Sequence, residues 1–234
     1  MKVLGLDSST LTAGVAVVDG TRALAEARGA GTRTSDLLVT LDDVCKRAGV
    51  APLELDAIAC GAGPRSFTSL RIGIATAKGI AFAAGKPLWA VSSLAALAHD
   101  AARRLGSPAN ARFVAVLDAR RGEVFAGCYD ATAKLLGEER VLAPTAVGAW
   151  LAPLLAGHDV HYAGDAIDAY PEAFAALASA WLPDRTPSGV AVALLAEAGA
   201  HVDVLTDGAP TYIRPSEAEV MYPDGVPGAL TRKR

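Results

Sequence analysis

The chain has 234 residues, 52% of them hydrophobic, and a formal net charge of −3. This length allows one large hydrophobic core or two smaller ones, and no apolar run approaches the roughly 20 residues that span a bilayer. The small negative charge gives no basic surface for holding nucleic acid directly, and Asp7 follows the start too closely for a secretory signal, so we expect a soluble, cytoplasmic protein.

Cysteine and histidine show no pattern typical of a disulfide framework or a metal site. Cys45, Cys60 and Cys128 are scattered and include no C-x-x-C pair, so buried thiols are the simplest interpretation. No two histidines are spaced four apart, as two metal ligands on one helix face would be. The sequence therefore predicts no metal.

The first half predicts three antiparallel strands followed by a helix, a strand and a second helix. Short apolar runs and the Asp19-Gly20 turn indicate the strands. Apolar residues at helical spacing, with acids early and bases late, indicate the first helix. The expected elements are strands at 3–6, 14–18 and 22–28, a helix at 36–48, a strand at 56–60 and a helix at 67–84.

The second half repeats this order. Its expected elements are strands at 112–117, 123–129 and 135–142, a helix at 145–155, a strand at 160–163 and a helical segment at 169–180. A duplicated β-β-β-α-β-α unit resembles the actin-like ATPase (ASKHA) fold of actin, sugar kinases and heat-shock chaperones, an α/β fold with two lobes. We therefore expect lobes at residues 1–100 and 101–214, with a tail at 215–234.

Asp7 and Asp118 close the first strand of each half, where nucleotide-binding relatives place an aspartate and glycines against phosphate. Here Ser8-Ser9 and Ala119-Arg120 stand where glycine would be expected. A third glycine-rich signal, for adenosine, is missing from residues 186–210. We predict a vestigial cleft in which both aspartates cap their own turns, and the alternative is that they hold magnesium-bound water.

The stretch at residues 61–85, GAGPRSFTSLRIGIATAKGIAFAAG, has the composition of a phosphate loop in the wrong order, because its lysine and glycine do not follow G-x-x-x-x-G-K-[ST]. It reads instead as a helix at 67–84, with Ser66 as N-cap and Gly85 as stop. Small residues form two rows at a spacing of four, Gly73, Ala77, Ala81 and Gly85 in one and Ala75, Gly79 and Ala83 in the other. These rows allow close helix packing, within the chain, with another protein, or both.

Six blocks, in this order, resemble the bacterial TsaB family, also called YeaZ: LGLDSST, GAGPRSFTSLRIGIATAKGIA, VSSLAALA, VLDARRGEVFAGCYD, YAGD and PTYIRPSEAE. The family signature G-P-G-S-F-T-G-[LV]-R-I-G is matched at Gly63, Pro64, Ser66, Phe67, Thr68, Arg71 and Gly73. Arg65 and Ser69 replace two signature glycines, and Thr34 lies about where many members have histidine.

The resemblance implies a non-catalytic subunit in the synthesis of threonylcarbamoyladenosine next to the anticodon of tRNA. Such a subunit pairs with TsaD, the transferase, is joined by TsaE, a P-loop ATPase, and forms a homodimer when TsaD is absent. It meets tRNA indirectly, through the complex, while direct contacts with tRNA stay open. ATP and magnesium are used by the partners, so no cofactor of its own is expected.

The family forms these contacts through the two helices of its first lobe, which here are 36–48 and 67–84. The expected interface residues are Leu37, Leu38, Leu41, Val44, Leu70, Ile74, Ala77 and Ala81, and no catalytic residue is expected. The alternative is an ATP- and magnesium-dependent kinase or acyltransferase that uses Asp7 and Asp118. A peptidase ranks last, because no nucleophile and base can be identified.

Overall fold

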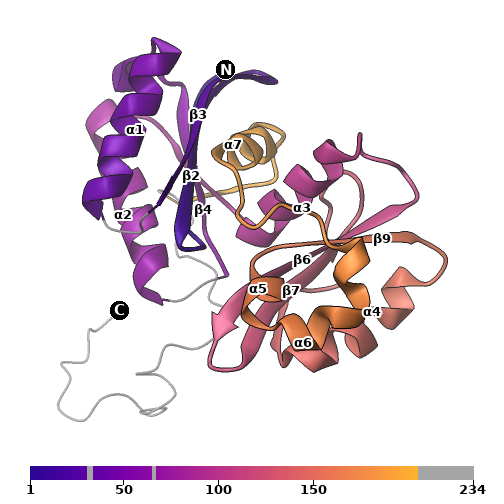
Figure 1. Cartoon of the computed structure of the whole chain (residues 1–234). Coiled ribbons are helices and arrows are strands. Elements are labelled where there is room, and N and C mark those ends of the chain that lie inside the picture. Colours follow the sequence, from indigo (N-terminus) through magenta and orange to yellow (C-terminus); the bar gives the residue numbers. More distant parts are fainter. Residues whose placement is uncertain (31–33, 65–66, 205–234) are drawn as a thin grey trace, which may run out of the picture.

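The computed structural model describes residues 1–30, 34–64 and 67–204, which form two β-sheets with helices on their faces (Figure 1). The first lobe begins with a strand triplet, continues through two helices and ends in a strand and a third helix. Its elements are β1 (Lys2–Asp7), β2 (Thr12–Asp19), β3 (Arg22–Ala30), α1 (Thr34–Ala48), the 3₁₀ turn Pro52–Glu54, β4 (Ala57–Gly61), α2 (Phe67–Ala84), β5 (Leu88–Val91) and α3 (Ser93–Arg104).

The remaining elements form the second sheet and then return to the first. They are β6 (Ala111–Arg120), β7 (Glu123–Tyr129), β8 (Arg140–Leu142), the 3₁₀ turn Pro144–Ala146, α4 (Val147–Leu155), β9 (Asp159–Ala163), α5 (Ala166–Ala169), α6 (Pro171–Phe174), the 3₁₀ segment Ala175–Ala180, α7 (Gly189–Glu197) and β10 (Val202–Asp203).

The two sheets share one topology. The first has the order β10-β5-β4-β1-β2-β3 and the second β8-β7-β6-β9. In each lobe the first strand pairs antiparallel with the second and parallel with the fourth. The strand order 3-2-1-4 is therefore repeated, which confirms the duplicated unit and the two-lobed α/β fold predicted from the sequence.

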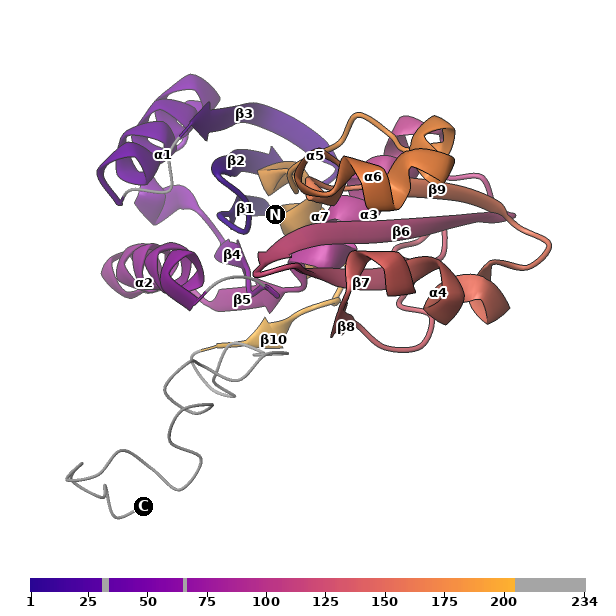
Figure 2. The ribbon, with the colours of Figure 1, turned by 60° about the horizontal axis from the view of Figure 1, so that its bottom comes forward.

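The central strands of the first sheet, β1, β2 and β4, are buried on both faces, so they are almost continuously apolar. Leu4 and Leu6 face α1 and α2 in one core, whereas the alternate residue Val3 faces α7 in another. The second sheet is covered by α3 on one face and by α4, α5 and α6 on the other (Figure 2). Among the described residues, no helix combines the length and apolarity needed to cross a membrane.

The structure differs from the expected lobe boundaries at its C-terminal end. Helix α7 packs on β1 and β2, and β10 pairs with β5 at the edge of the first sheet. The contact is so close that a Cβ atom on Gly189 would lie 2.4 Å from the amide nitrogen of Ala16. Residues 189–203 therefore belong to the first lobe, and the expected tail, 215–234, lies outside the described residues.

Two further differences concern single elements. The expected helix at 169–180 is broken into short segments, because Pro171 lacks an amide hydrogen and Tyr170 before it adopts a non-helical conformation. Strand β5 and helix α3 were not predicted. Helix α3 packs against both β6 and α7, and it lies between the two sheets in both views (Figures 1 and 2).

Candidate docking surface

Helices α1 and α2 lie side by side on the face of the first sheet that points away from the second lobe. Helix α1 has Asp36 in its first turn and Lys46 and Arg47 in its last, which suits the helix dipole. Ion pairs of Lys46 with Asp42 (2.6 Å) and of Arg47 with Asp43 (2.8 Å) hold its outer surface. These four charges are exposed, so they contribute solubility more than stability.

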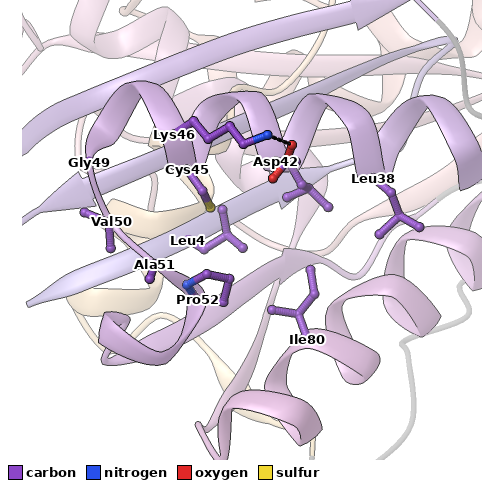
Figure 3. A pocket seen from close by; sticks show the side chains of 11 residues that line it. Leu4, Leu38, Asp42, Cys45, Lys46, Gly49, Val50, Ala51, Pro52 and Ile80 are labelled. Atoms are coloured by element: carbon purple, nitrogen blue, oxygen red, sulfur yellow. Dashed lines mark hydrogen bonds and ion pairs between the residues drawn. The ribbon is translucent and has the colours of Figure 1, made fainter.

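A hollow of about 400 Å³ opens between α1, α2 and the turn that precedes β4 (Figure 3). Leu38 of α1 and Ile80 of α2 face each other across it, and Leu4 of β1 lies at its floor. Two neighbouring hollows continue it along α2 and share Gly79 and Ile80. Together they form an apolar groove, which we call the α1–α2 groove.

Large apolar side chains are exposed on the two helices that form this groove and in the turn before β4, although only Leu38 and Leu53 among them line the hollows. Phe82 of α2 is 89% exposed, Val39 of α1 is 70% exposed, and Leu53, which lines one of the hollows, is 70% exposed. Leu38 is 49% exposed. Exposed apolar side chains gathered around a groove are typical of a protein-binding surface, whereas single exposed leucines are ordinary.

Six of the eight expected interface residues are buried within the chain. Within the chain's own core are Leu37, Leu41, Val44, Ile74, Ala77 and Ala81. The apolar stripe of each helix is used first to cover the sheet, so these six side chains offer little surface to a partner, and their role as contact residues stays a prediction. Leu38 does reach the surface, and the side chain of Leu70 lies outside the described residues.

The two rows of small residues in α2 have different surroundings. A Cβ atom on Gly73 would lie 2.4 Å from Oγ of Ser8, so this glycine is required by packing within the chain, as is the fully buried Ala77. The other row, Ala75, Gly79 and Ala83, is exposed. A Cβ atom on Gly79 would meet nothing within 4 Å, so the fold of the chain itself does not explain a glycine there.

The signature loop leads from β4 into α2. Gly63 has a positive φ of 96°, which favours glycine, and it is joined by a cis peptide bond to Pro64. Arg71 is exposed on α2 and Gly73 is buried. Arg65, which replaces a signature glycine, lies with Ser66 outside the described residues, as do the side chains of Phe67 and Thr68.

Asp7 is fully buried at the end of β1. Its Oδ1 accepts a hydrogen bond from the amide of Ser9 (2.6 Å), and its Oδ2 accepts one from the hydroxyl of Ser93 (2.6 Å). A Cβ atom on the neighbouring Gly61 would lie 1.8 Å from Oδ2. Asp7 therefore caps its own turn and ties β1 to the start of α3.

Asp118 has the equivalent position in the second lobe and a similar role. Its Oδ1 accepts hydrogen bonds from the amide of Arg120 (2.7 Å) and the hydroxyl of Tyr170 (3.0 Å), and Oδ2 pairs with the Arg120 guanidinium (3.1 Å). The turn continues through Arg120 and Arg121, both with positive φ. Nearby, burial raises the pKa of Asp165 to about 6.

Another hollow, separate from the α1–α2 groove and not indicated by the sequence, lies where the two lobes meet. It has a volume of about 400 Å³ and is bordered by the signature loop at Ala62–Pro64, by Ser92, by Glu139 and by His201. Burial raises the pKa of Glu139. A serine directly before a helix is a recognisable N-cap signal, so Ser92 could have been found from the sequence. Nothing in the sequence indicates that Glu139 lies next to it. Within residues 1–30, 34–64 and 67–204, no cluster of three or more histidine, cysteine or acidic side chains is placed to hold a metal.

The repeated 3-2-1-4 strand order and the junction between the lobes define an actin-like α/β protein. A family model described as "TsaD: tRNA N6-adenosine threonylcarbamoyltransferase" matches residues 32–180. TsaB of Escherichia coli (strain K12) is 36% identical over 126 residues, 53% of this chain and 53% of its own length. The match thus spans about half of that curated relative.

Two solved structures extend the likeness over most of the chain. A Pseudomonas aeruginosa protein described as similar to peptidase YeaZ has a TM-score of 0.74 and 34% identity, covering 91% of this chain and 99% of its own. YeaZ from Pseudomonas aeruginosa has a TM-score of 0.71 and 33% identity, covering 88% and 98%. The chain belongs to the TsaB (YeaZ) family.

Proposed function

We propose that this chain is a non-catalytic subunit in the synthesis of threonylcarbamoyladenosine next to the anticodon of tRNA. It pairs with TsaD, brings in TsaE, and forms a homodimer when TsaD is absent. It reaches tRNA only through the complex, works in the cytoplasm, and leaves ATP and magnesium to its partners. The names of its relatives support the pathway, and the α1–α2 groove supports the mode of action.

One observation carries the docking role: the exposed row Ala75, Gly79 and Ala83 beside Phe82. An exposed glycine inside a helix costs roughly 1 kcal/mol relative to alanine, and at Gly79 the chain's own packing does not require it. Small residues let a second backbone approach closely, and the groove beside them accepts larger side chains. A specific interface takes about 800 Å² from each partner, which one helix cannot supply, so both helices take part.

The docking test is a tryptophan at an exposed position of this row. Gly79→Trp fills space that a partner helix would use, and its Cβ atom would meet nothing within 4 Å in the chain itself. We expect an unchanged melting curve, loss of self-association in sedimentation, and loss of TsaD in a pull-down. A variant with a normal melting curve that still binds TsaD and itself would contradict the proposed surface. Ala77→Trp is unsuitable, because Ala77 is buried and the change tests folding.

The rival function, an ATP-dependent kinase or acyltransferase, needs Asp7 and Asp118 to face magnesium. Against it stand the full burial of Asp7 and the hydrogen bonds that both of its oxygens already accept. Calorimetric titration with Mg-ATP separates the two proposals. We expect no heat of binding at micromolar nucleotide, and binding that is lost in Asp7→Asn would favour the enzyme.

A further inference from the structure

Two consecutive serines at the start of α3 hold different parts of the molecule. Ser93 lies against the signature loop, because its amide donates to the carbonyl of Gly63 (2.7 Å) and its Oγ accepts from the amide of Gly63 (3.3 Å). The same Oγ donates to Asp7 (2.6 Å). Ser93 is fully buried, so these bonds are shielded from water and its position fixes that of Gly63.

Ser92 faces the second lobe. Its Oγ accepts from the amide of Ala95 (3.2 Å), as an N-cap does, and donates to Glu139. Tyr129 of β7, which is buried, donates its hydroxyl to the same oxygen of Glu139 (2.5 Å). Glu139 stands in the connection between β7 and β8, so this carboxylate joins the second sheet to the first turn of α3.

The loop held by Ser93 is short and leads directly into α2. Helix α2 begins at Phe67, four residues after Gly63. Its second turn also rests on the same corner, since Gly73 packs on Ser8, next to Asp7. The aspartate turn at the end of β1 therefore contacts α2 at Gly73 and reaches the loop before α2 through Ser93.

We propose that Glu139 and the Ser92–Ser93 pair are positioning residues, through which the second lobe fixes the loop at Ala62–Pro64 and the first turns of α2. The contact between the lobes thereby sets the geometry of one wall of the α1–α2 groove. Its consequence for docking rests on the function proposed above, but the positioning itself is a property of the isolated chain.

Hydrogen exchange of the full chain without partners tests this positioning. Glu139→Ala leaves the N-cap of α3 intact and removes its link to the second lobe. We expect exchange in peptides covering residues 61–72 to rise about tenfold, the scale of one lost charge-assisted hydrogen bond, while peptides from α1 remain unchanged. The matched control is Glu138→Ala, whose exposed carboxylate pairs only with Arg140 among the described residues and should leave 61–72 as in the parent.

If Glu139→Ala folds poorly, variants of the serine residues test the same proposal. Ser92→Ala should raise exchange at 61–72 in the same way, and Ser92→Thr should restore it. The control is Ser188→Ala, which removes the N-cap of α7 and the hydrogen bond from Ser188 to Asp100. It should not change exchange at residues 61–72. The proposal is overturned if Glu139→Ala and Ser92→Ala leave these peptides unchanged, or if either control raises them equally. Failure of TsaD to bind the parent chain would overturn the docking function and leave this result standing.

Discussion

Gly73 and Gly79 lie six residues apart on α2 and have opposite surroundings. Gly79 faces open space, whereas a Cβ atom on Gly73 would lie 2.4 Å from Oγ of Ser8. We expect Gly79→Ala to raise the free energy of unfolding by about 1 kcal/mol, the difference in helix propensity. Gly73→Ala should lower it by about 1 to 3 kcal/mol, as overpacking does. Urea unfolding of both variants measures this, and equal stability of the two would contradict the assignment of the rows.

The buried carboxyl group of Asp100 predicts how the free energy of unfolding depends on pH. It accepts two hydrogen bonds from Ser188, both 2.7 Å, yet burial dominates and raises its pKa to about 6. The folded chain therefore holds a proton that the unfolded chain releases near pH 4, so the free energy of unfolding falls as pH rises from about 4 to 6, by about 3 kcal/mol from this group.

The matched variant for this prediction is Asp100→Asn, which keeps an acceptor for Ser188 and cannot titrate. Its free energy of unfolding should fall less steeply between pH 4 and 6 than that of the parent chain. Asp165, whose pKa is also raised to about 6, contributes in both proteins and cancels in the comparison. Parallel stability curves for parent and variant across this window would show that Asp100 does not titrate there.

At the scale of single residues, local turn chemistry could be predicted from the sequence more reliably than the direction in which a side chain points. The turn chemistry of Asp7 and Asp118 is local, so it could be inferred from the residues that follow each aspartate. The exposure of Phe82 and the burial of Ala77 depend on how α2 is rotated against the sheet. In a helix so rich in alanine and glycine, both faces look alike in the sequence, and the rotation is decided by tertiary packing.

At the scale of elements, we expect substitutions on the exposed faces of α1 and α2 to change docking without changing stability. Phe82→Ala removes an aromatic ring that is 89% exposed, so the free energy of unfolding should change by less than about 0.5 kcal/mol. If Phe82 is a contact anchor, docking should weaken by about 1 to 3 kcal/mol, or roughly fivefold to 150-fold. Sedimentation of the variant alone and titration with TsaD measure both effects.

The control for Phe82 is Leu11→Ala. Leu11 is also apolar and 64% exposed, but it lies between β1 and β2, away from the α1–α2 groove. It should leave both stability and docking unchanged. If the two variants weaken docking equally, exposed apolar surface in general, and not this groove, would be responsible.

Elements with a strong local pattern were predicted closely. Helix α2 has the predicted bounds, and α1 begins only two residues earlier than expected. β5 is short and α3 is rich in alanine, and both depend on neighbours distant in the sequence. Helix α7 shows little amphipathic pattern because most of it is buried, so periodicity could not place it against the first sheet.

For the whole molecule, the repeated order of elements was sufficient to predict two lobes, because β-β-β-α-β allows few arrangements of a sheet. It was not sufficient to place residues 189–203, which return from the second lobe to the first. That return passes through the Ser188 contact with Asp100 on α3 and the paired Arg104 and Asp184. The return to the first lobe is thus held by polar contacts to α3, between positions that sequence spacing does not bring together.

The central claim is that this chain acts by docking and not by chemistry of its own. Its most direct test is reconstituted formation of threonylcarbamoyladenosine on tRNA with TsaD, TsaE and the enzyme that supplies the threonylcarbamoyl adenylate, with this chain omitted, restored, or replaced by Gly79→Trp. We expect full product with the parent chain and with Asp7→Asn provided that variant folds, and almost none without the chain or with Gly79→Trp. Full product without the chain, or with a folded Gly79→Trp that no longer binds TsaD, would contradict this claim.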